Sequence, residues 1–499
     1  MSRHARGTHA FPALALLLGS LLPAASLAGQ EKPNGRVDLA ILHVHVVDVK
    51  QGRVIPDQTV LVRDGEIANV APTATSEAPS AAVTIDASGM WMTPGLWDMH
   101  AHLRANGLPA WVGTDWIMPL LLAHGVTGVR DMASDCDDSS QGPVCFEQMR
   151  DWQARIESGD LLGPRILALS SFPLNPPWDY QVTEEQARQA VAMLDDRGHE
   201  HIKIYHRLAP EALGWLLDEA GKRELDAWGH VPLRMTAAVA ADAGFRSVEH
   251  ARDFLFDCYP GSAAFRASAR SQDAPIDEMR AMVENHDSVQ CEAEFRALVR
   301  NGTAYVPTHL TRRMEAFAGD SSFRHDPRVR YVPGFVLAAW EQDADRVVAR
   351  DSTPPGRAAY LEFYEKGLEI TGAAHRAGVR VLVGTDGGDS YVFPGSAVHD
   401  ELGELVKAGL SPAEALRAAT SSPAEFLGLT ARYGSVDPGK RADLVLLGAN
   451  PLDDIENVRR IEAVVFRGAL LDRDRLDGLL RQAESAVARP LEGTDTQKD

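Results

Sequence analysis

Residues 93–103 read TPGLWDMHAHL, a Pro-Gly turn followed by a short apolar run and the pattern His-x-His. Side chains alternate between the two faces of a strand, so His100 and His102 point to the same side. Two adjacent imidazoles pack poorly in a core, but neutral imidazole is a good ligand for zinc and related metals. The stretch therefore predicts a strand that ends in two ligands for one metal ion.

Further short apolar runs follow this strand, and stretches with helical spacing such as TEEQARQAVAMLDDRG separate them. The expected strands are residues 96–103, 125–132, 164–171, 201–206, 225–231, 247–251, 303–310 and 381–387. Strands that alternate with helices favour parallel βα units. Eight such units predict an α/β fold with a (β/α)8 TIM barrel, in which the chemistry lies at the carboxyl ends of the strands.

The connections after the sixth and seventh expected strands are longer than a plain βα loop. Such lengths predict lids or extra helices over the site. The first of these connections, about 252–300, is expected to be a lid that selects the substrate.

Both ends of the chain outside this region read as short strands broken by turn signals such as Gln51-Gly52 and Asp64-Gly65. The chain has 499 residues, of which 45% are hydrophobic, so a large core and more than one domain are expected. The formal charge of −20 argues against a nucleic acid or an anionic membrane surface as a partner, because either would require a basic patch.

Residues 1–28 have the pattern of a cleaved signal peptide. Arg3 and Arg6 give a basic start, an apolar stretch follows, and Ser26-x-Ala28 fits cleavage between small residues. The apolar stretch is too short to span a bilayer and Pro23 interrupts it, so no stable membrane anchor is expected. The segment predicts export to the periplasm or secretion.

Export makes disulfides possible, and the chain has four cysteines. Four cysteines allow three connectivities, and four free thiols are the alternative. Neighbours in the sequence suggest the pairs Cys136–Cys145 and Cys258–Cys291. No pair has C-x-x-C spacing, which argues against a zinc knuckle or a redox motif.

If the barrel forms, polar side chains from five of its strands converge on one mouth. They are His100, His102, Lys203, His230, His250 and Asp386. Each has an ordinary explanation by itself: a hydrogen-bonded histidine, a solvated lysine or a turn aspartate. Their joint placement favours a shared site. A second His-x-His, His43 and His45, lies in the strand-rich N-terminal region without partner ligands and is expected to be structural or exposed.

Taken together, these motifs resemble the amidohydrolase superfamily, in the branch of imidazolonepropionase-like and prolidase-like metal-dependent hydrolases. The resemblance rests on GEIANV, TPGLWDMHAHL, IKIY, GHV, SVEH, GTDGG, SPAEALRAATSSPAEFLGL, YGSVDPGKRADLVLL and NPLDDI. It implies that the terminal segments combine into a β-sandwich beside the barrel. The expected parts are a signal peptide (1–28), the N-terminal part of the sandwich (33–91), the hydrolase domain (92–425), the C-terminal part of the sandwich (426–480) and a tail (481–499).

The resemblance also implies the role of each site residue. His100 and His102 would bind the more buried of two divalent metal ions, zinc by default, together with Asp386. His230 and His250 would bind the second ion, and a carboxylated Lys203 would bridge the two. Two cations lower the pKa of a shared water and so supply hydroxide near neutral pH. Asp386 would accept the proton of this nucleophile and pass it to the leaving amine.

The expected activity is therefore hydrolysis of amide C–N bonds in small molecules such as dipeptides and N-acyl amino acids. Tyr205, His309 and Arg104 are candidate substrate contacts, and Arg312-Arg313 could bind a substrate carboxylate. A mononuclear deaminase or a hydrolase of cyclic imides or lactones is an alternative, since a single metal needs no bridging anion. An exported binding protein without activity is another. A homo-oligomer is expected from the resemblance alone.

Overall fold

The computed structural model describes residues 37–76, 80–104, 107–136, 144–177 and 180–489. The predicted signal peptide and residues 490–499 of the predicted tail lie outside the described residues.

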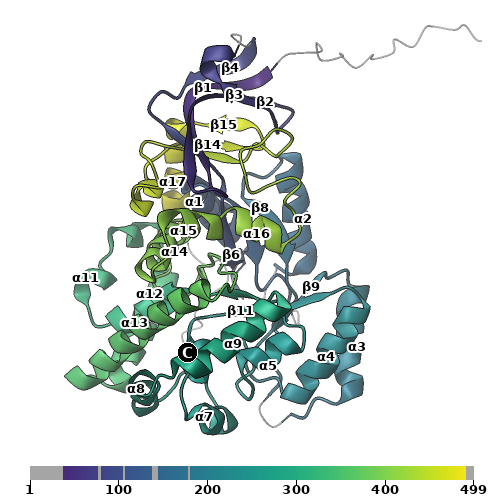
Figure 1. Ribbon diagram of the computed structural model, residues 1–499, viewed down its shortest axis with the longest axis vertical. Coiled ribbons are helices and arrows are strands. Elements are labelled where there is room, and N and C mark those ends of the chain that lie inside the picture. The colour runs from purple at the N-terminus through teal and green to yellow at the C-terminus, as the bar shows by residue number, and fades with distance from the viewer. Residues whose placement is uncertain (1–36, 77–79, 105–106, 137–143, 178–179, 490–499) are drawn as a thin grey trace, which may run out of the picture. The chain divides into compact units, whose positions relative to one another are not determined.

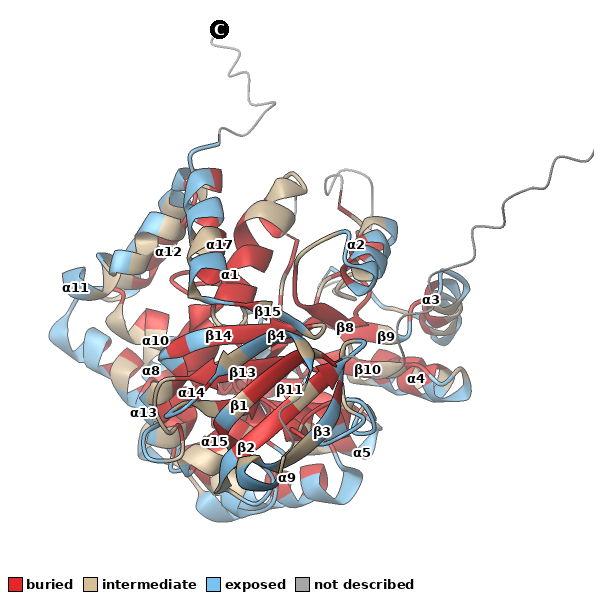
Figure 2. Cartoon of the chain, turned by 90° about the horizontal axis from the view of Figure 1, so that it is seen from above, coloured by how far each residue is buried: buried red, intermediate tan, exposed pale blue. Residues whose placement is uncertain are grey.

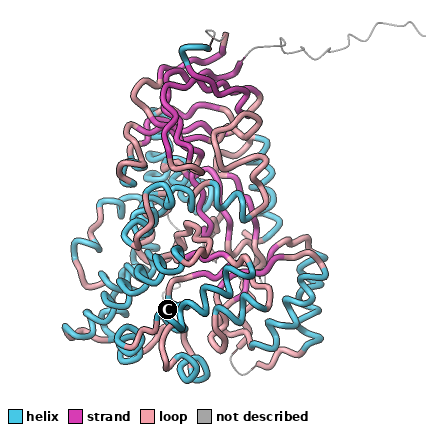
Figure 3. Tube along the Cα trace, viewed as in Figure 1, coloured by secondary structure: helices cyan, strands magenta, loops and turns pink. Residues whose placement is uncertain are grey.

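Short parallel strands form the centre of the fold, in two sheets that follow one another along the chain (Figures 1 and 3). The first sheet contains β6 (Leu96–Ala101), β7 (Val126–Asp131) and β8 (Arg165–Leu169). The second contains β9 (His201–Ile204), β10 (Asp226–Gly229), β11 (Ser247–Glu249) and β12 (Ala304–Val306). These are the first seven strands that the sequence predicts. Most of their residues are buried, as apolar runs between helices require.

Backbone hydrogen bonds join the two sheets into a ring. Between β8 and β9, the amide of Ser171 donates to the carbonyl of His201 at 3.0 Å. On the other side, the segment 381–386 lies between β12 and β6: the amide of Leu382 donates to Tyr305 O, and the amide of Met99 donates to Val383 O. The eighth predicted strand therefore occupies its expected place but is not a continuous strand: Val381 forms only an isolated bridge to Tyr305, and the backbone has positive φ at Asp386.

Helices cover the ring from outside, with their buried faces inward and their exposed faces outward (Figure 2). Local signals in the sequence fix several of these helices. Thr183 and Gln186 form a capping box at the start of α3 (Glu184–Asp196), and Ser411 and Glu414 form another at α15 (Pro412–Ala418). The other helices before the insertion are α1 (Met118–Ala123), α2 (Phe146–Ser158), α4 (Pro210–Lys222) and α5 (Ala237–Asp242).

The two long connections are helical, as predicted. The connection after β11 forms α6 (Arg252–Asp257), α7 (Ser262–Ser268), α8 (Ile276–Glu284) and α9 (Ser288–Asn301). Because α9 packs on α5, it continues the outer layer of helices, and α6–α8 are the inserted part. The stretch after β12 forms α10 (His309–Phe317), α11 (Ser321–Arg324), α12 (Gly334–Arg350) and α13 (Pro354–Arg376). The remaining helices are α14 (Ser396–Lys407), α16 (Ser421–Phe426) and α17 (Arg473–Ala486).

Both predicted disulfides are confirmed. Cys136 is bonded to Cys145, and Cys258 at the end of α6 is bonded to Cys291 in the first turns of α9. No cysteine of the described chain is free. Two disulfides are consistent with an oxidising compartment. As for a membrane, the described helices include none with the length and apolar character needed to cross it.

Replacing Cys258 and Cys291 together by Ser is expected to lower the free energy of unfolding by about 4 kcal/mol, against about 3 kcal/mol for the Cys136 and Cys145 pair. The Cys258–Cys291 bond closes a loop with a sequence separation of 33, and the Cys136–Cys145 bond closes one of 9. Closing the longer loop removes more conformational entropy from the unfolded chain. Urea unfolding of the two double variants measures the difference. An equal loss in both would contradict the loop-entropy explanation.

The terminal segments combine into one mixed sheet. It contains β1 (Val37–Asp48), β2 (Arg53–Arg63), β3 (Glu66–Pro72), β4 (Ala81–Asp86), β5 (Trp91–Pro94), β13 (Leu444–Leu447), β14 (Ile461–Phe466) and β15 (Ala469–Leu471). The strand order is β15-β14-β13-β5-β1-β2-β3. The long strand β1 pairs with β4 through its first half and with β5 through its second half. Strands from the two ends of the chain meet where β13 pairs with β5.

The sheet curls back on itself. The amide of Ala442, just before β13, donates to Gly65 O beside β3, and the amide of Ile67 donates to Lys440 O. The curl encloses an apolar core of its own, separate from the core around the ring. His43 and His45 lie in β1 of this sheet, where Asp57 contacts both: its carboxylate lies 2.9 Å from His43 Nδ1, and its amide donates to His45 Nδ1. They are therefore not part of the cluster at the ring.

Candidate functional site

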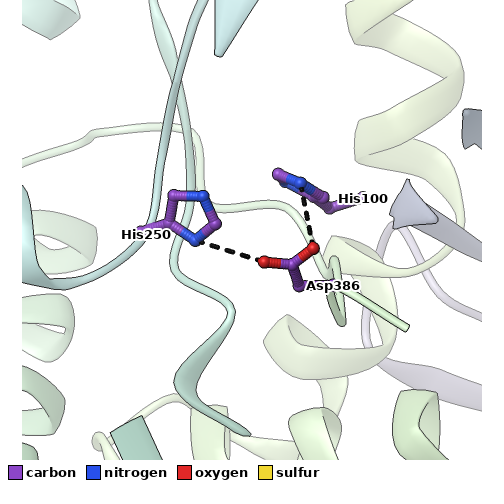
Figure 4. Close-up of side chains that lie close together, drawn as sticks. All are labelled: His100, His250 and Asp386. Carbon is purple, nitrogen blue, oxygen red and sulfur yellow. Dashed lines mark ion pairs between the residues drawn. The ribbon is translucent and has the colours of Figure 1, made fainter. Parts of the chain in front are cut away.

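The six side chains that the sequence predicts as ligands all line one cavity of about 1030 Å³. Asp386 lies at the centre of the cluster. Its Oδ1 is 3.0 Å from His102 Nε2 and 3.4 Å from His100 Nε2, and its Oδ2 is 3.8 Å from His250 Nδ1. Figure 4 shows the carboxylate between the rings of His100 and His250. Nitrogen and oxygen atoms of these two histidines and Asp386 lie close enough together to hold one metal ion.

The other two predicted ligands extend this cluster. His230 Nε2 lies 3.0 Å from His250 Nε2, so two ring nitrogens face a common point. Lys203 Nζ lies 3.5 Å from His100 Nε2, and both side chains are buried. Contacts of 3.5 Å or less therefore link His100 to Lys203 and His230 to His250.

Two of the candidate ligand residues have unusual backbone conformations. His250 has φ 75° and Asp386 has φ 59°, in the left-handed region that residues other than glycine rarely adopt. Neighbouring glycines allow the close packing. A Cβ on Gly229 would lie 2.2 Å from the carbonyl oxygen of Ile204, and one on Gly384 would lie 2.8 Å from His100 Cβ. In the motifs GHV and GTDGG, the first glycine is therefore needed because a side chain there would collide with its neighbours, while the His and Asp are the candidate ligands.

A buried ion pair orients His100 from behind. Glu249 Oε2 lies 2.8 Å from His100 Nδ1, which leaves Nε2 directed at Asp386 and Lys203. Arg130 binds both oxygens of Glu249 at 2.8 and 3.0 Å. A carboxylate behind a metal-binding histidine fixes its tautomer and ring orientation. Neither Arg130 nor Glu249 was predicted from the sequence, although Glu249 directly precedes His250.

Asp98 joins two elements that carry ligands. Its carboxylate accepts hydrogen bonds from the amides of His100 and Thr385 and from the hydroxyl of Thr385. Burial raises the pKa of Asp98 to about 6. The signal for Asp98 was present in the sequence, since it stands two residues before His100 and shares the face of the strand with both histidines.

The electrostatic state of the cluster suits metal ligation. Burial lowers the pKa of His100 to about 4 and holds the pKa of His230 and His250 well below the usual range, so all three rings are neutral near pH 7. Burial also lowers the pKa of the Lys203 amine to about 8. Neutral imidazole nitrogens beside a carboxylate form the donor set that zinc and similar divalent cations prefer. The residues present therefore fit a metal ion.

The cavity above the cluster has an aromatic wall and several charged groups. Trp116 and Phe172 line it from the first half of the ring, and Phe335 and Trp340 line it from α12. Among the described residues, the predicted lid at 252–300 contributes only Arg252 and Gln272 to the lining of the cavity. Of the two long connections, the one after β12 contributes more lining residues, mostly from α12. The expectation that 252–300 is a lid that selects the substrate stays a prediction.

The three candidate substrate contacts lie in different surroundings. Tyr205 lines the cavity, and its ring packs against His230 with a centroid distance of 3.9 Å. His309 does not line the cavity: it is fully buried at the start of α10. Arg104 lines the cavity, but its guanidinium donates to the carbonyls of Ala133, Asp135 and Val144. Arg104 therefore holds the backbone around the Cys136–Cys145 disulfide, which favours a structural role for it.

Comparison with known proteins agrees with this geometry. The sequence model described as the amidohydrolase family matches residues 358–471. A dihydroorotase of Pelotomaculum thermopropionicum is 28% identical over 454 residues, which cover 85% of this chain and 93% of the relative. Among solved structures, bottromycin amidohydrolase superposes with a TM-score of 0.69 at 23% identity and covers 90% of both chains. A protein designated a prolidase from Bifidobacterium longum superposes with a TM-score of 0.61 at 26% identity, over 90% of this chain and 99% of its own.

Proposed function

We propose that this chain, a hydrolase of the amidohydrolase superfamily that acts on C–N bonds, uses two divalent metal ions to cleave small amides such as dipeptides and N-acyl amino acids. One observation carries the proposal: four histidines, Lys203 and Asp386 line one cavity as a connected cluster, in which His102 and Asp386 are partly exposed and the others are buried. A purely structural cluster would not need to leave this many ligand atoms facing a cavity.

Divalent cations at this cluster would make a shared water acidic and polarise the scissile carbonyl. His100, His102, His230 and His250 would hold the cations, with zinc as the expected metal. Asp386 is the group that can take a proton from the attacking water and deliver it to the nitrogen of the leaving amine. Its contacts to His100 and His102 keep the carboxylate in place for both steps.

Lys203 is the proposed bridge between the two metal positions. A neutral amine can add to carbon dioxide, forming a C–N bond and releasing one proton, and the resulting carbamate is an anionic ligand with two oxygens. The burial of Lys203 supports this modification, because it favours the neutral amine that must react. A cationic lysine would instead repel the metal ions.

The alternatives make different demands on the same residues. A mononuclear deaminase or cyclic-imide hydrolase would use the group His100, His250 and Asp386 without a bridging carbamate. A binding protein without activity would not require a carboxylate placed against two ligand histidines. The position of Lys203 beside His100 favours the binuclear amidase over both.

Metal removal tests the proposal. Protein stripped with a chelator is expected to lose at least 99% of its amide hydrolysis, and reloading with zinc, manganese or cobalt in bicarbonate should restore it with about two metals per chain. The substrates are a panel of dipeptides, N-acyl amino acids and dihydroorotate, assayed by product release and by elemental analysis of the protein. Hydrolysis that survives removal of the metal would refute the proposal, and one metal per fully active chain would favour the mononuclear alternative.

Three further assignments belong to the proposal. We infer that the ring with its helices is a (β/α)8 barrel and that the curled sheet of the terminal segments corresponds to the β-sandwich of the superfamily. We also infer that residues 1–28 direct export to the periplasm or the outside of the cell, which would allow both disulfides to form. The proposed partner is a small amide. A homo-oligomer is also proposed, and light scattering tests it.

A further inference from the structure

We propose that Arg252, together with Gln272, selects substrates whose leaving amine carries an α-carboxylate. The inference rests on the proposed amide hydrolysis and names the substrate class of the same site. Arg252 is the first residue of α6, two positions after the ligand His250, and it lines the cavity with only 4% of its surface exposed.

The guanidinium of Arg252 has hydrogen-bonding capacity that the protein leaves unused. Its Nη2 lies 2.9 Å from His230 Nδ1 and donates to Gln272 Oε1 at 2.7 Å. Its Nη1 and Nε have no hydrogen-bond partner among the described residues, and no described carboxylate forms an ion pair with it. A buried guanidinium normally requires an anion, because desolvation of its charge is costly. We expect the substrate that binds in the cavity to supply this anion.

The acidic groups nearest to Arg252 are already engaged. Asp253 pairs with Arg266 at 3.4 Å, and Asp273 accepts a hydrogen bond from Arg350 at 2.7 Å. Glu315, on α10, lies 2.6 Å from Arg312.

Arg312 also lines the cavity and faces the same region as Arg252. After these pairings, none of the described carboxylates is left within ion-pair distance of the Arg252 guanidinium. A carboxylate on the substrate would supply two acceptor oxygens in the geometry that a guanidinium binds best.

The position of Arg252 indicates which carboxylate it would bind. Its Nη2 contacts His230, a proposed metal ligand, so an anion bound by Arg252 lies close to the reacting carbonyl. In an N-acyl amino acid or at the C-terminus of a dipeptide, one carbon separates the α-carboxylate from the scissile nitrogen. A more distant carboxylate would not reach the cluster and Arg252 together. The aromatic wall of Trp116, Phe335 and Trp340 remains for the apolar parts of the substrate.

The test compares free acids with their neutral amides. We expect wild-type kcat/KM to be about 100-fold higher for N-acetyl-L-phenylalanine, N-acetyl-L-leucine or N-acetyl-L-alanine than for the corresponding carboxamide, measured as release of acetate. Arg252→Gln should reduce this preference to less than about 5-fold, and Arg252→Lys should retain part of it. Arg346→Gln is the matched control, since Arg346 lines the same cavity but pairs with Asp343 at 2.6 Å, and the preference should remain.

Equal use of acids and amides by the wild-type protein would overturn the inference, as would an Arg252→Gln variant that loses both activities in the same proportion. Circular dichroism checks that each variant is folded, and the wild-type comparison stands even if Arg252→Gln does not fold. If no compound is cleaved, the proposed function fails for this panel. The role of Arg252 in binding a carboxylate is then tested separately, by the binding of the same compounds. The same N-acetyl amino acids should then raise the Tm of the metal-loaded wild type and not that of Arg252→Gln, and no shift in the wild type would refute the inference.

Discussion

Asp386→Asn is expected to lower kcat/KM for amide hydrolysis by about 1000-fold or more, since general acid–base groups contribute up to about 10⁴-fold and this residue is also a proposed metal ligand. Its carboxylate makes contacts with three of the four histidines of the cluster. Burial alone would raise the pKa of Asp386, but His100, His102 and Lys203 outweigh it and hold the pKa well below the usual range. Asparagine keeps the shape and removes both the charge and the site that accepts a proton.

Steady-state kinetics of the metal-loaded variant, with elemental analysis beside it, separate the two losses. Retained metal with a lost kcat would assign proton transfer to Asp386, whereas lost metal would assign ligation. Asp389→Asn is the matched control, because Asp389 lines the same cavity three residues later. Burial and the charge of Asp386 raise the pKa of Asp389 to about 7, and its replacement should change kcat/KM by less than about 10-fold. Equal losses in both variants would contradict a special role for Asp386.

Lys203→Ala is expected to reduce the metal content from about two ions per chain to one or fewer and to lower kcat by about 1000-fold. The reason is the loss of a bridging anion between positions held otherwise by neutral histidines. Lys203 is 2% exposed, so alanine also leaves space for a small carboxylate. Added formate or acetate should therefore restore part of the metal binding and activity of this variant.

Lys222→Ala provides the control for the lysine substitution. Lys222 lies at the end of α4, where its amine pairs with Asp218 and more than half of its side chain is exposed. This variant should bind metal and hydrolyse amides like the wild-type protein. Unchanged metal content in Lys203→Ala would refute the bridged pair and leave the mononuclear alternative.

The candidate metal ligands are the part of the site that the local sequence predicted most completely. His100, His102, Lys203, His230, His250 and Asp386 all line the cavity, because strand alternation and strand order already place such residues at one end of a parallel ring. The disulfide pairs were also predicted correctly, since short separations favour pairing of neighbours. The eighth strand was only partly predicted, because the motif GTDGG bends the backbone around Asp386.

Contacts between distant segments could not be read in the same way. Arg104 was a plausible substrate contact by position, yet its guanidinium is used by the carbonyls around the Cys136–Cys145 disulfide. His309 follows a strand of the ring but packs inside the protein. Arg130 and Glu249 orient His100 from two other strands, and nothing in the local sequence of either residue indicates this pairing.

The sequence by itself determined the candidate metal ligands, the alternation of strands and helices and the resemblance to a hydrolytic superfamily, because these depend on residue type and on short-range periodicity. The tertiary structure decided that Arg252 lines the cavity without an ion pair to a described carboxylate, and that α12 supplies Phe335 and Trp340 to the aromatic wall. Such features depend on distances between segments far apart in the chain. Local periodicity contains no information about those distances.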